Sequence, residues 1–375
     1  MSYQVLARKW RPGNFKELVG QEHVVQALVN ALDSKRLHHA YLFTGTRGVG
    51  KTTIARIFAK SLNCDTGISS EPCGECAFCL EVDEGRSIDL IEIDAASRTG
   101  VDDMRELLDN VQYAPTRGRF KIYLVDEVHM LSRHSFNALL KTLEEPPPHI
   151  KFLLATTDPQ KLPVTVLSRC LQFNLKRMSK QQILSHLQYL TGEEKVETET
   201  AALALLASAA DGSMRDGLSL LDQAIACGGG SVSLSTTEAM LGTISRDYLV
   251  KLFDSLLQQD AARLLEEARN VIAHNPDYAR VCAEMISLLH QMALYRSEAA
   301  IEPEDDWMGE QIVALSARLS SEEIQLYYQI MLQGRRDLSI SPDAATGFEM
   351  LMLRLLAFSP DAGAATPAPL EKKSP

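Results

Sequence analysis

Residues 45–52 read Gly-Thr-Arg-Gly-Val-Gly-Lys-Thr, and this octapeptide constrains the fold more than any other segment of the chain. It matches G-x-x-x-x-G-K-[ST], a loop whose backbone N–H groups surround the phosphates of a nucleotide. Residues 39–44 before it have the composition of a buried strand, and residues 53–60 after it have helical spacing. Strand, loop and helix are the context that a phosphate site needs, because the helix N-terminus adds partial positive charge. The alternative is a glycine-rich turn without a ligand.

The residue types in this octapeptide suit the binding of ATP. The glycines let the main chain curl around an anion, where a Cβ would block the approach. We expect Lys51 to reach the β- and γ-phosphates and the hydroxyl of Thr52 to bind Mg²⁺. The predicted nucleotide contacts in the loop are Gly45, Thr46, Arg47, Gly48, Val49, Gly50, Lys51 and Thr52.

The chain has 375 residues, of which 45% are hydrophobic. A chain of this length is expected to form two or three domains with buried cores. It contains no run of eighteen apolar residues, so we expect no membrane span. The first ten residues lack the apolar core of a secretory signal, and we therefore expect a cytoplasmic protein.

The net charge of −11 is unevenly distributed along the chain. Residues 1–180 carry +3, with 24 basic and 21 acidic side chains, whereas residues 181–375 carry −14. Phosphate contacts dominate DNA affinity, so an acidic protein is a poor candidate for tight DNA binding by itself. The slightly basic N-terminal part still allows a local groove for DNA, and the acidic C-terminal part is suited to contacts with other proteins or with solvent.

Strand-like and helical segments alternate from residue 20 to residue 175, which predicts a parallel sheet covered on both faces. The expected strands are the apolar runs 40–44, 90–93, 121–125 and 152–155. The expected helices are 22–35, 50–62, 101–113 and 132–145. Residues 1–178 are therefore interpreted as one α/β domain.

After about residue 178 no further strands are expected. Residues 179–242 predict a small helical domain, and residues 243–358 predict a domain of longer amphipathic helices. Residues 359–375 are too poor in apolar side chains to pack, so we expect a disordered tail or the stub of a linker. The predicted fold class is α/β plus all-α.

Two carboxylates directly follow one of the predicted strands. Asp126 and Glu127 come after the apolar run 121–125. We expect Asp126 in the outer shell of Mg²⁺, and we expect Glu127 to orient or deprotonate an attacking water. The alternative is a solvated acidic turn. With the phosphate loop upstream, two acids at this place favour ATP hydrolysis over transfer of a phosphoryl group to another acceptor.

Three more residues are candidates for phosphate chemistry. Thr157 follows the strand 152–155, and ligands of doubly wound sheets gather at the carboxyl ends of strands, so it is expected either to bond the γ-phosphate or the water, or simply to cap a turn. Ser213 is expected to cap a helix and place Arg215 in its first turn. Arg169 and Arg215 suit the stabilisation of charge on a transferring phosphoryl group, although a lone arginine is more often a surface ion-pair partner.

Four of the seven cysteines fall in one short segment with the spacing C-x₈-C-x₂-C-x₂-C. Four thiolates can close on one tetrahedral Zn²⁺, and because no coordination position stays open, the zinc would be structural. Disulfides are disfavoured in a cytosolic protein. The predicted zinc ligands are Cys64, Cys73, Cys76 and Cys79. The isolated Cys170, Cys227 and Cys282 are interpreted as small core residues.

Together these motifs resemble the AAA+ ATPases, specifically their clamp-loader branch. The segment Ala7–Gln21 is similar to the family's adenine-side segment, in which Arg11 and Val19 are expected to contact the nucleotide. The resemblance covers the chain up to its tail, and the cysteine insertion makes it specific. The other matching motifs are residues 45–52, the four-cysteine insertion at about 64–79, Asp126-Glu127, Leu143–Pro147, Ser168–Cys170 and Gly212–Arg215.

The resemblance implies a RecA-like domain, a small helical lid and a helical collar that assembles a ring, pentameric in this family. It implies an ATPase that opens a sliding clamp and places it on primer-template DNA, with homologous subunits as partners and no polymerase active site in this chain. By motif position, Arg169 resembles the arginine finger that reaches a neighbouring subunit's ATP, and Arg215 resembles the lid arginine that senses the γ-phosphate.

The same resemblance implies ATP, Mg²⁺ and structural Zn²⁺ as cofactors, and a cytoplasmic location at the nucleoid. Family members continue past the collar to bind helicase and polymerase, and a chain that ends at Pro375 would lack those regions.

Four residues are candidates for contacts with the DNA backbone: Arg98, Thr99, Arg105 and Lys141. The first two lie in the segment 96–102, which precedes a predicted helix whose N-terminal amides suit a phosphate. Solvated surface charge is the alternative.

Three other functions are weighed against the clamp loader. A scaffold that binds ATP without turnover would not need Glu127. A zinc-centred DNA-binding module fits poorly with the acidic balance and the intact phosphate loop. Another AAA+ DNA-remodelling motor, such as a branch-migration subunit, is disfavoured by the cysteine insertion.

Overall fold

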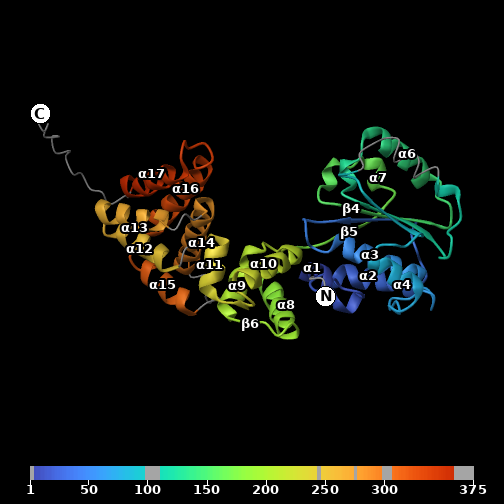
Figure 1. The fold of residues 1–375 in the computed structure, drawn as a ribbon. Coiled ribbons are helices and arrows are strands. Elements are labelled where there is room, and N and C mark those ends of the chain that lie inside the picture. The colour runs from blue at the N-terminus through green and yellow to red at the C-terminus, as the bar shows by residue number, and fades with distance from the viewer. Residues whose placement is uncertain (1–3, 98–109, 243–245, 274–276, 298–305, 359–375) are drawn as a thin grey trace, which may run out of the picture. The chain divides into compact units, whose positions relative to one another are not determined.

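The computed structural model describes residues 4–97, 110–242, 246–273, 277–297 and 306–358. The chain divides into two compact units, Met1–Leu234 and Ser235–Pro375. The first unit contains a sheet with helices around it, and the described part of the second unit is helical (Figure 1). The predicted fold class, α/β plus all-α, is therefore confirmed.

Parallel strands form the sheet of the first unit. They are β1 (Ala40–Thr44), β2 (Leu90–Asp94), β3 (Lys121–Asp126), β4 (Ile150–Thr156) and β5 (Leu171–Asn174). Their order across the sheet is β2-β3-β4-β1-β5. The register of the neighbouring inner strands β1 and β4 places Ala40 opposite Phe152. Both strands are buried along their whole length, as parallel strands with both faces covered must be.

Helices cover both faces of this sheet (Figure 1). On one face lie α2 (Glu22–Asp33), α3 (Lys51–Asn63) and α4 (Ala77–Glu84), and on the other lie α6 (Arg133–Glu144) and α7 (Val164–Leu167). Tyr41 and Phe43 of β1 share a core with Phe58 of α3, whereas Leu42 between them shares a second core with Leu139 of α6. Alternate residues of one strand therefore supply two separate cores, because successive side chains point to opposite faces.

Strands that the sequence analysis did not predict are also present. β5 has mostly exposed residues and pairs with β1, so its Leu-Gln-Phe-Asn sequence contains no apolar run. The expectation that no strand follows residue 178 is wrong, because β6 (Glu197–Thr198) and β7 (Ser231–Val232) pair with each other. Strands of two residues are too short to carry a periodic signal. The predicted helix 101–113 lies mostly outside the described residues.

Three helices complete the first unit: α8 (Lys180–Glu193), α9 (Thr200–Ala209) and α10 (Met214–Cys227). The N-terminal helix α1 (Leu6–Lys9) lies against α10, where the N–H of Leu6 donates to Asp222 Oδ2 at 2.8 Å. Next to it, the indole N–H of Trp10 donates to Glu194 Oε1 at 2.6 Å. These two bonds join the N-terminal segment to the helical part of the unit.

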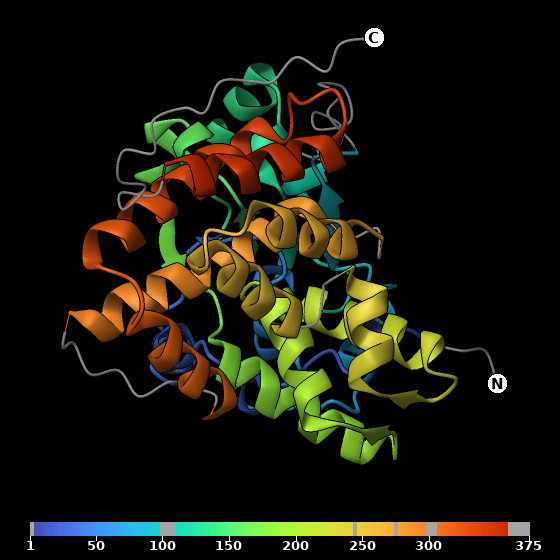
Figure 2. The same ribbon diagram turned by 90° about the vertical axis from the view of Figure 1, so that its left-hand side faces the viewer.

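The helices of the second unit share one core of buried side chains. Figure 2 shows these helices turned by 90° from the view of Figure 1. Phe253, Leu289 and Phe348 are fully buried in it. Its helices are α12 (Arg246–Leu257), α13 (Ala261–Ala273), α14 (Tyr278–Arg296), α15 (Asp306–Ser316), α16 (Ser321–Asp337) and α17 (Ala344–Ala357), and α11 (Leu234–Leu241) begins at the end of the first unit. Within the described part of the chain, no helix combines the length and apolarity needed to cross a membrane.

Candidate functional site

The octapeptide 45–52 forms the loop between β1 and α3. Gly45, Gly48 and Gly50 have φ angles of 145°, 77° and 103°, a region that residues with a Cβ rarely adopt. Gly50 is the N-cap of α3, so the helix begins at Lys51. The first N–H groups of a helix have no partner within it, and together with the helix dipole they make this end of α3 suitable for an anion.

Lys51 folds back across the loop that precedes it. Its Nζ donates to the carbonyl oxygens of Gly45 at 2.9 Å and Thr46 at 3.0 Å, and the residue is 6% exposed. Burial lowers the pKa of Lys51, while the carboxylates of Glu127 and Asp126 act in the opposite direction. The ammonium group is thus held beside the loop, where it can bind phosphate oxygens.

Asp126, the last residue of β3, meets the loop through Thr52. The hydroxyl of Thr52 donates to Asp126 Oδ2 at 2.7 Å, and Asp126 Oδ1 accepts the N–H of Glu127 at 3.0 Å. A hydroxyl and a carboxylate side by side are oxygen ligands that Mg²⁺ accepts. The structure therefore brings together the two residues predicted to hold magnesium.

Glu127 is the N-cap of a short 3₁₀-helix, η3 (Val128–Met130), with φ 47° and ψ 45°. This left-handed conformation is uncommon for a glutamate and costs about 1 kcal/mol or more. Oε2 of Glu127 accepts two bonds from Thr157, one from its N–H at 3.1 Å and one from its hydroxyl at 2.8 Å. Thr157 therefore lies against Glu127, and its expected contact with the γ-phosphate or the water stays a prediction.

Helix α10 lies directly against the phosphate loop. Ser213 caps the helix by accepting the N–H of Asp216 at 3.2 Å, and Arg215 lies in the first turn, as the sequence predicts. The N–H of Arg215 donates to the carbonyl oxygen of Gly48 at 3.5 Å. A Cβ on Gly48 would lie 1.8 Å from Ser213 Oγ, so the contact requires glycine.

A pocket lies between the phosphate loop, the N-terminal segment, and helices α8 and α10. Burial lowers the pKa of Arg11, and the positive charges of Arg56 and Arg215 lower it further. The negative charge of Glu92 acts in the opposite direction and raises it. The cationic side chains in this pocket suit a polyphosphate. The residues predicted to serve the nucleotide that line it are Arg11, Val19, Arg47, Gly48, Val49, Gly50, Lys51, Thr52, Asp126, Glu127 and Arg215.

The pocket also contains residues that the sequence analysis did not single out. Trp10, Met178, His186 and Leu218 line it. His186 and Leu218 lie on α8 and α10, and nothing in their helical spacing separates a pocket residue from a core residue. Burial lowers the pKa of His186, which favours the neutral imidazole.

Arg169 lies outside the lining of this pocket. Its Nη2 is 2.8 Å from Glu144 Oε1, and its Nη1 donates to the carbonyl oxygen of Thr165 at 2.8 Å. These contacts place the guanidinium group near the end of α6 and beside α7. The structure therefore does not bring Arg169 together with Lys51 within one chain.

One of the predicted DNA contacts can be placed. Lys141 is exposed on α6. Arg98, Thr99 and Arg105 lie outside the described residues.

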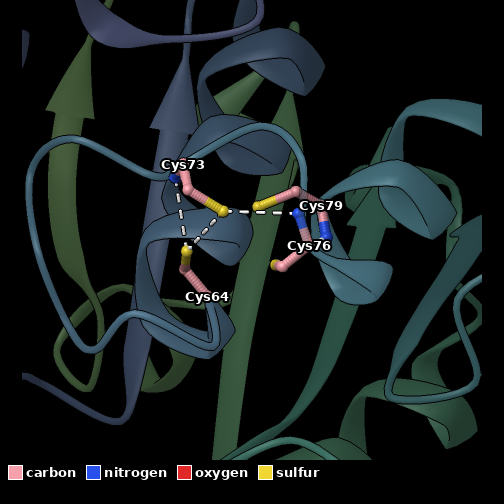
Figure 3. A group of neighbouring side chains, drawn as sticks. All are labelled: Cys64, Cys73, Cys76 and Cys79. Atoms are coloured by element: carbon pink, nitrogen blue, oxygen red, sulfur yellow. Dashed lines mark hydrogen bonds between the residues drawn. The ribbon is translucent and has the colours of Figure 1, made fainter.

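The four cysteines of the insertion converge from the end of α3, the following loop and the start of α4 (Figure 3). All four sulfur atoms lie within 4.8 Å of one another. A tetrahedral site with Zn–S bonds of about 2.3 Å needs sulfur atoms about 3.8 Å apart. The N–H groups of Cys73 and Cys76 donate to the sulfurs of Cys64 and Cys73, each at 3.3 Å, which stabilises thiolate charge. These cysteines fit the predicted Zn²⁺.

The other cysteines differ from one another. Cys282 is buried, as expected, and Cys170 is partly buried. Cys227 is exposed at the end of α10, so its interpretation as a core residue is wrong.

Three family models match successive parts of the chain. Residues 20–179 match the model described as DNA polymerase III, delta subunit, and residues 182–230 match the DNA polymerase III clamp loader subunit, ATPase lid domain. Residues 232–366 match DNA polymerase III subunits gamma and tau domain III.

Individual proteins that are similar to this chain include DNA polymerase III subunits and a branch migration motor. DNA polymerase III subunit tau of Escherichia coli K12 is 56% identical over 96% of this chain and 56% of its own length. DNA polymerase III subunit gamma of Buchnera aphidicola subsp. Acyrthosiphon pisum is 45% identical over 95% of this chain and 99% of its own length. A solved structure of the Thermotoga maritima RuvB branch migration motor is 19% identical, with a TM-score of 0.47 over 66% of this chain and 79% of that one.

The chain spans about half the length of the curated tau relatives that it matches. It covers the Buchnera gamma subunit almost completely. The match extends through the phosphate loop, the lid and the C-terminal helices. The chain therefore belongs to the tau/gamma family of DNA polymerase III clamp-loader subunits, within the AAA+ ATPases.

Proposed function

We propose that this chain is an ATP-hydrolysing motor subunit of the replicative clamp loader, which opens the sliding clamp and loads it onto primed DNA. The meeting of Thr52, Asp126 and Glu127 at the phosphate loop carries the proposal. It supplies metal ligands and a base to a site already suited to polyphosphate. Membership of the tau/gamma family supports the proposal that the sliding clamp is the protein on which this motor acts.

Binding of ATP is proposed to place its triphosphate on the N-terminus of α3. Lys51 and Arg215 would neutralise the β- and γ-phosphates, and the adenine ring of ATP would lie toward Arg11 and Val19. Thr52 and Asp126 would hold Mg²⁺, which when bound supplies positive charge to the phosphate oxygens.

Hydrolysis is proposed to use Glu127 as the group that orients the attacking water and accepts its proton. The water oxygen forms a bond to the γ-phosphorus, and the bond from that phosphorus to the bridging oxygen breaks, so that ADP and phosphate leave. Thr157 fixes the Glu127 carboxylate. Arg169 would stabilise the transferring group from a neighbouring subunit, consistent with its place outside the pocket of its own chain.

The parts of the chain have separate proposed roles. Residues 1–178 form the motor domain, 179–242 the lid and 243–358 the collar, with a tail over 359–375. The Cys64, Cys73, Cys76 and Cys79 cluster holds a structural Zn²⁺. The collar joins homologous subunits into a pentameric ring, which acts at the nucleoid in the cytoplasm.

Contact with primer-template DNA is proposed for Arg98, Thr99, Arg105 and Lys141. Charge reversal of Arg98 and Arg105 is expected to weaken the stimulation of ATPase by DNA and to leave ATP binding intact, because backbone contacts are electrostatic. An unchanged DNA response would contradict this assignment.

The proposed function is tested by an ATPase assay with the clamp and primed DNA, with and without the companion subunits. We expect stimulation only when all components are present, and near-complete loss in Glu127→Gln. The complete mixture failing to hydrolyse ATP would overturn the proposal and favour an ATP-binding scaffold. Stimulation by four-way junction DNA without the clamp would favour a branch-migration motor.

A further inference from the structure

His129 lies beside Glu127, with 9% of its side chain exposed. Its Nδ1 is 2.9 Å from Thr156 Oγ1 and 3.4 Å from Glu127 Oε2. Thr156 is fully buried at the end of β4, and its Oγ1 also accepts the N–H of Asp158 at 3.1 Å. One imidazole nitrogen therefore faces both a buried hydroxyl and a carboxylate.

These two neighbours determine which tautomer of His129 fits. A lone pair on Nδ1 would face the carboxylate of Glu127 and be repelled by it, whereas an N–H is attracted to both oxygens. We therefore assign the proton of the neutral ring to Nδ1. In this form His129 donates to Thr156 and presents the positive end of an N–H bond to Glu127.

Glu127 needs to be held by its neighbours. Its backbone is in the strained left-handed region, and 28% of its side chain is exposed. The N–H and hydroxyl of Thr157 and the Nδ1–H of His129 all face Oε2. When Oε2 is fixed from three directions, the direction of Oε1 is fixed as well, since the carboxylate is planar.

We propose that His129, which is itself held by Thr156, is a positioning residue for Glu127 and keeps its carboxylate in the direction needed to take the proton of the attacking water. This inference rests on the proposed role of Glu127 in hydrolysis. His129 touches neither phosphate nor water in this scheme. Its loss should therefore slow turnover without weakening ATP binding.

Two amide substitutions separate positioning from general packing. In His129→Asn the side-chain amide can occupy the place of Nδ1, whereas in His129→Gln it reaches the place of Nε2. For the chain assembled with its companion subunits, clamp and primed DNA, we expect kcat to fall about tenfold in His129→Gln and His129→Ala, with the Kd for ATP unchanged. His129→Asn should stay within about threefold of the wild-type kcat. Equal rates for the two amides, or a parallel loss of ATP affinity, would overturn the inference.

A double substitution distinguishes this inference from the proposed function. If Glu127 acts as proposed, Glu127→Gln is nearly inactive, and adding His129→Ala lowers its residual rate no further. Normal turnover by Glu127→Gln would overturn the role of Glu127, whereas a further loss in the double variant would overturn the positioning role of His129. The ¹⁵N shifts of the labelled His129 ring give a readout without activity. The Nδ1–H form supports the inference, and the Nε2–H form overturns it whatever the rates.

Discussion

The hydroxyl of Thr52 donates a hydrogen bond of 2.7 Å to Oδ2 of Asp126. Thr52 follows β1 and Asp126 ends β3, and in the sheet these two strands are separated by β4. The bond therefore reaches across the end of β4 and fixes two oxygen atoms at one place. The proposed magnesium site depends on this contact between the first turn of α3 and the end of β3.

Substitution Asp126→Asn tests that site because it keeps the size of the side chain and removes its charge. We expect the ATP affinity in the presence of Mg²⁺ to fall about tenfold, because a carboxylate in the outer shell orients the groups that bind the metal. Calorimetric titration at a series of Mg²⁺ concentrations should show a flatter dependence on the metal. Asp94 is the matched control, since it lies opposite Asp126 in the register of β2 and β3. An equal loss in Asp94→Asn would mean that charge at this edge of the sheet, and not the metal position, sets the affinity.

The core of the second unit allows a test of packing. Gly334 lies in α16, and a Cβ there would be 2.2 Å from Leu351 Cδ1 of α17. Alanine usually stabilises a helix by about 1 kcal/mol relative to glycine, but overpacking costs about 1–3 kcal/mol, so Gly334→Ala should destabilise the protein. We expect a lower urea midpoint in equilibrium unfolding.

Gly192 is the control for that prediction. It lies in α8, and no described atom comes within 4 Å of the position of its Cβ. Gly192→Ala should leave stability unchanged or raise it. Adding Leu351→Ala to Gly334→Ala should cost less than the sum of the two single effects, because the clash is removed. Additive effects would contradict the proposed contact.

The strands of the first unit could be predicted where they are buried and apolar. The run 121–125 became β3 (Lys121–Asp126), and the run 152–155 became the middle of β4. β5 could not be predicted, because an exposed edge strand has no need of apolar residues. The position of Asp126 near the phosphate loop could also be predicted, because Asp126 ends β3 and parallel strands bring their carboxyl ends to one edge of the sheet.

Other parts of the site depend on contacts that the sequence does not display. His186 and Leu218 reach the pocket because bonds such as that of Trp10 to Glu194 join the N-terminal segment to the helices. His129 is two residues from Glu127, yet its role depends on Thr156, which the pairing of β3 with β4 brings beside it. A local pattern cannot indicate such pairs.

Zinc content gives a direct test of the cysteine cluster. We expect about one Zn²⁺ per chain, and Cys79→Ser should lose the metal and lower the melting temperature, because four ligands closing one site contribute folding energy. Elemental analysis and thermal unfolding are the measurements. The exposed Cys227 lies outside the cluster, so Cys227→Ser should keep both values. A folded chain that contains no zinc when purified without chelators would contradict the prediction.

Two partly buried histidines make the stability of the first unit depend on pH. Burial lowers the pKa of His186, and burial followed by the charges of His38 and Lys151 lowers that of His39, in each case from an ordinary value of 6.5. The unfolded chain therefore binds more protons than the folded chain as the pH falls through this range, and stability decreases with decreasing pH.

The pH range in which stability changes follows from the lowered pKa values of these two histidines. The urea midpoint should fall between about pH 7 and pH 5, and it should fall less in the double variant His39→Gln/His186→Gln. Replacement of the exposed His134 is the control and should keep the wild-type dependence. The same slope in the double variant would show that other groups cause the pH dependence.

The position of Arg169 predicts that a single chain has an incomplete ATPase site. Its guanidinium group is paired with Glu144, outside the lining of the pocket that contains Lys51. Arg169→Ala should lower clamp- and DNA-stimulated ATPase about a thousandfold, the usual effect of removing an arginine finger, without changing ATP affinity. Arg177, which is exposed and paired with Asp211, is the control.

Mixing two inactive variants tests whether Arg169 acts across subunits. Lys51→Ala lacks a working pocket but keeps the finger, and Arg169→Ala has the opposite defect. In a ring with head-to-tail contacts, random mixing pairs an intact pocket with an intact finger at about one interface in four, so activity should reappear. Steady-state ATPase of the co-assembled mixture is the measurement. If the variants co-assemble, as shown by size-exclusion chromatography, and the mixture still does not turn over ATP, Arg169 does not serve a neighbour's nucleotide.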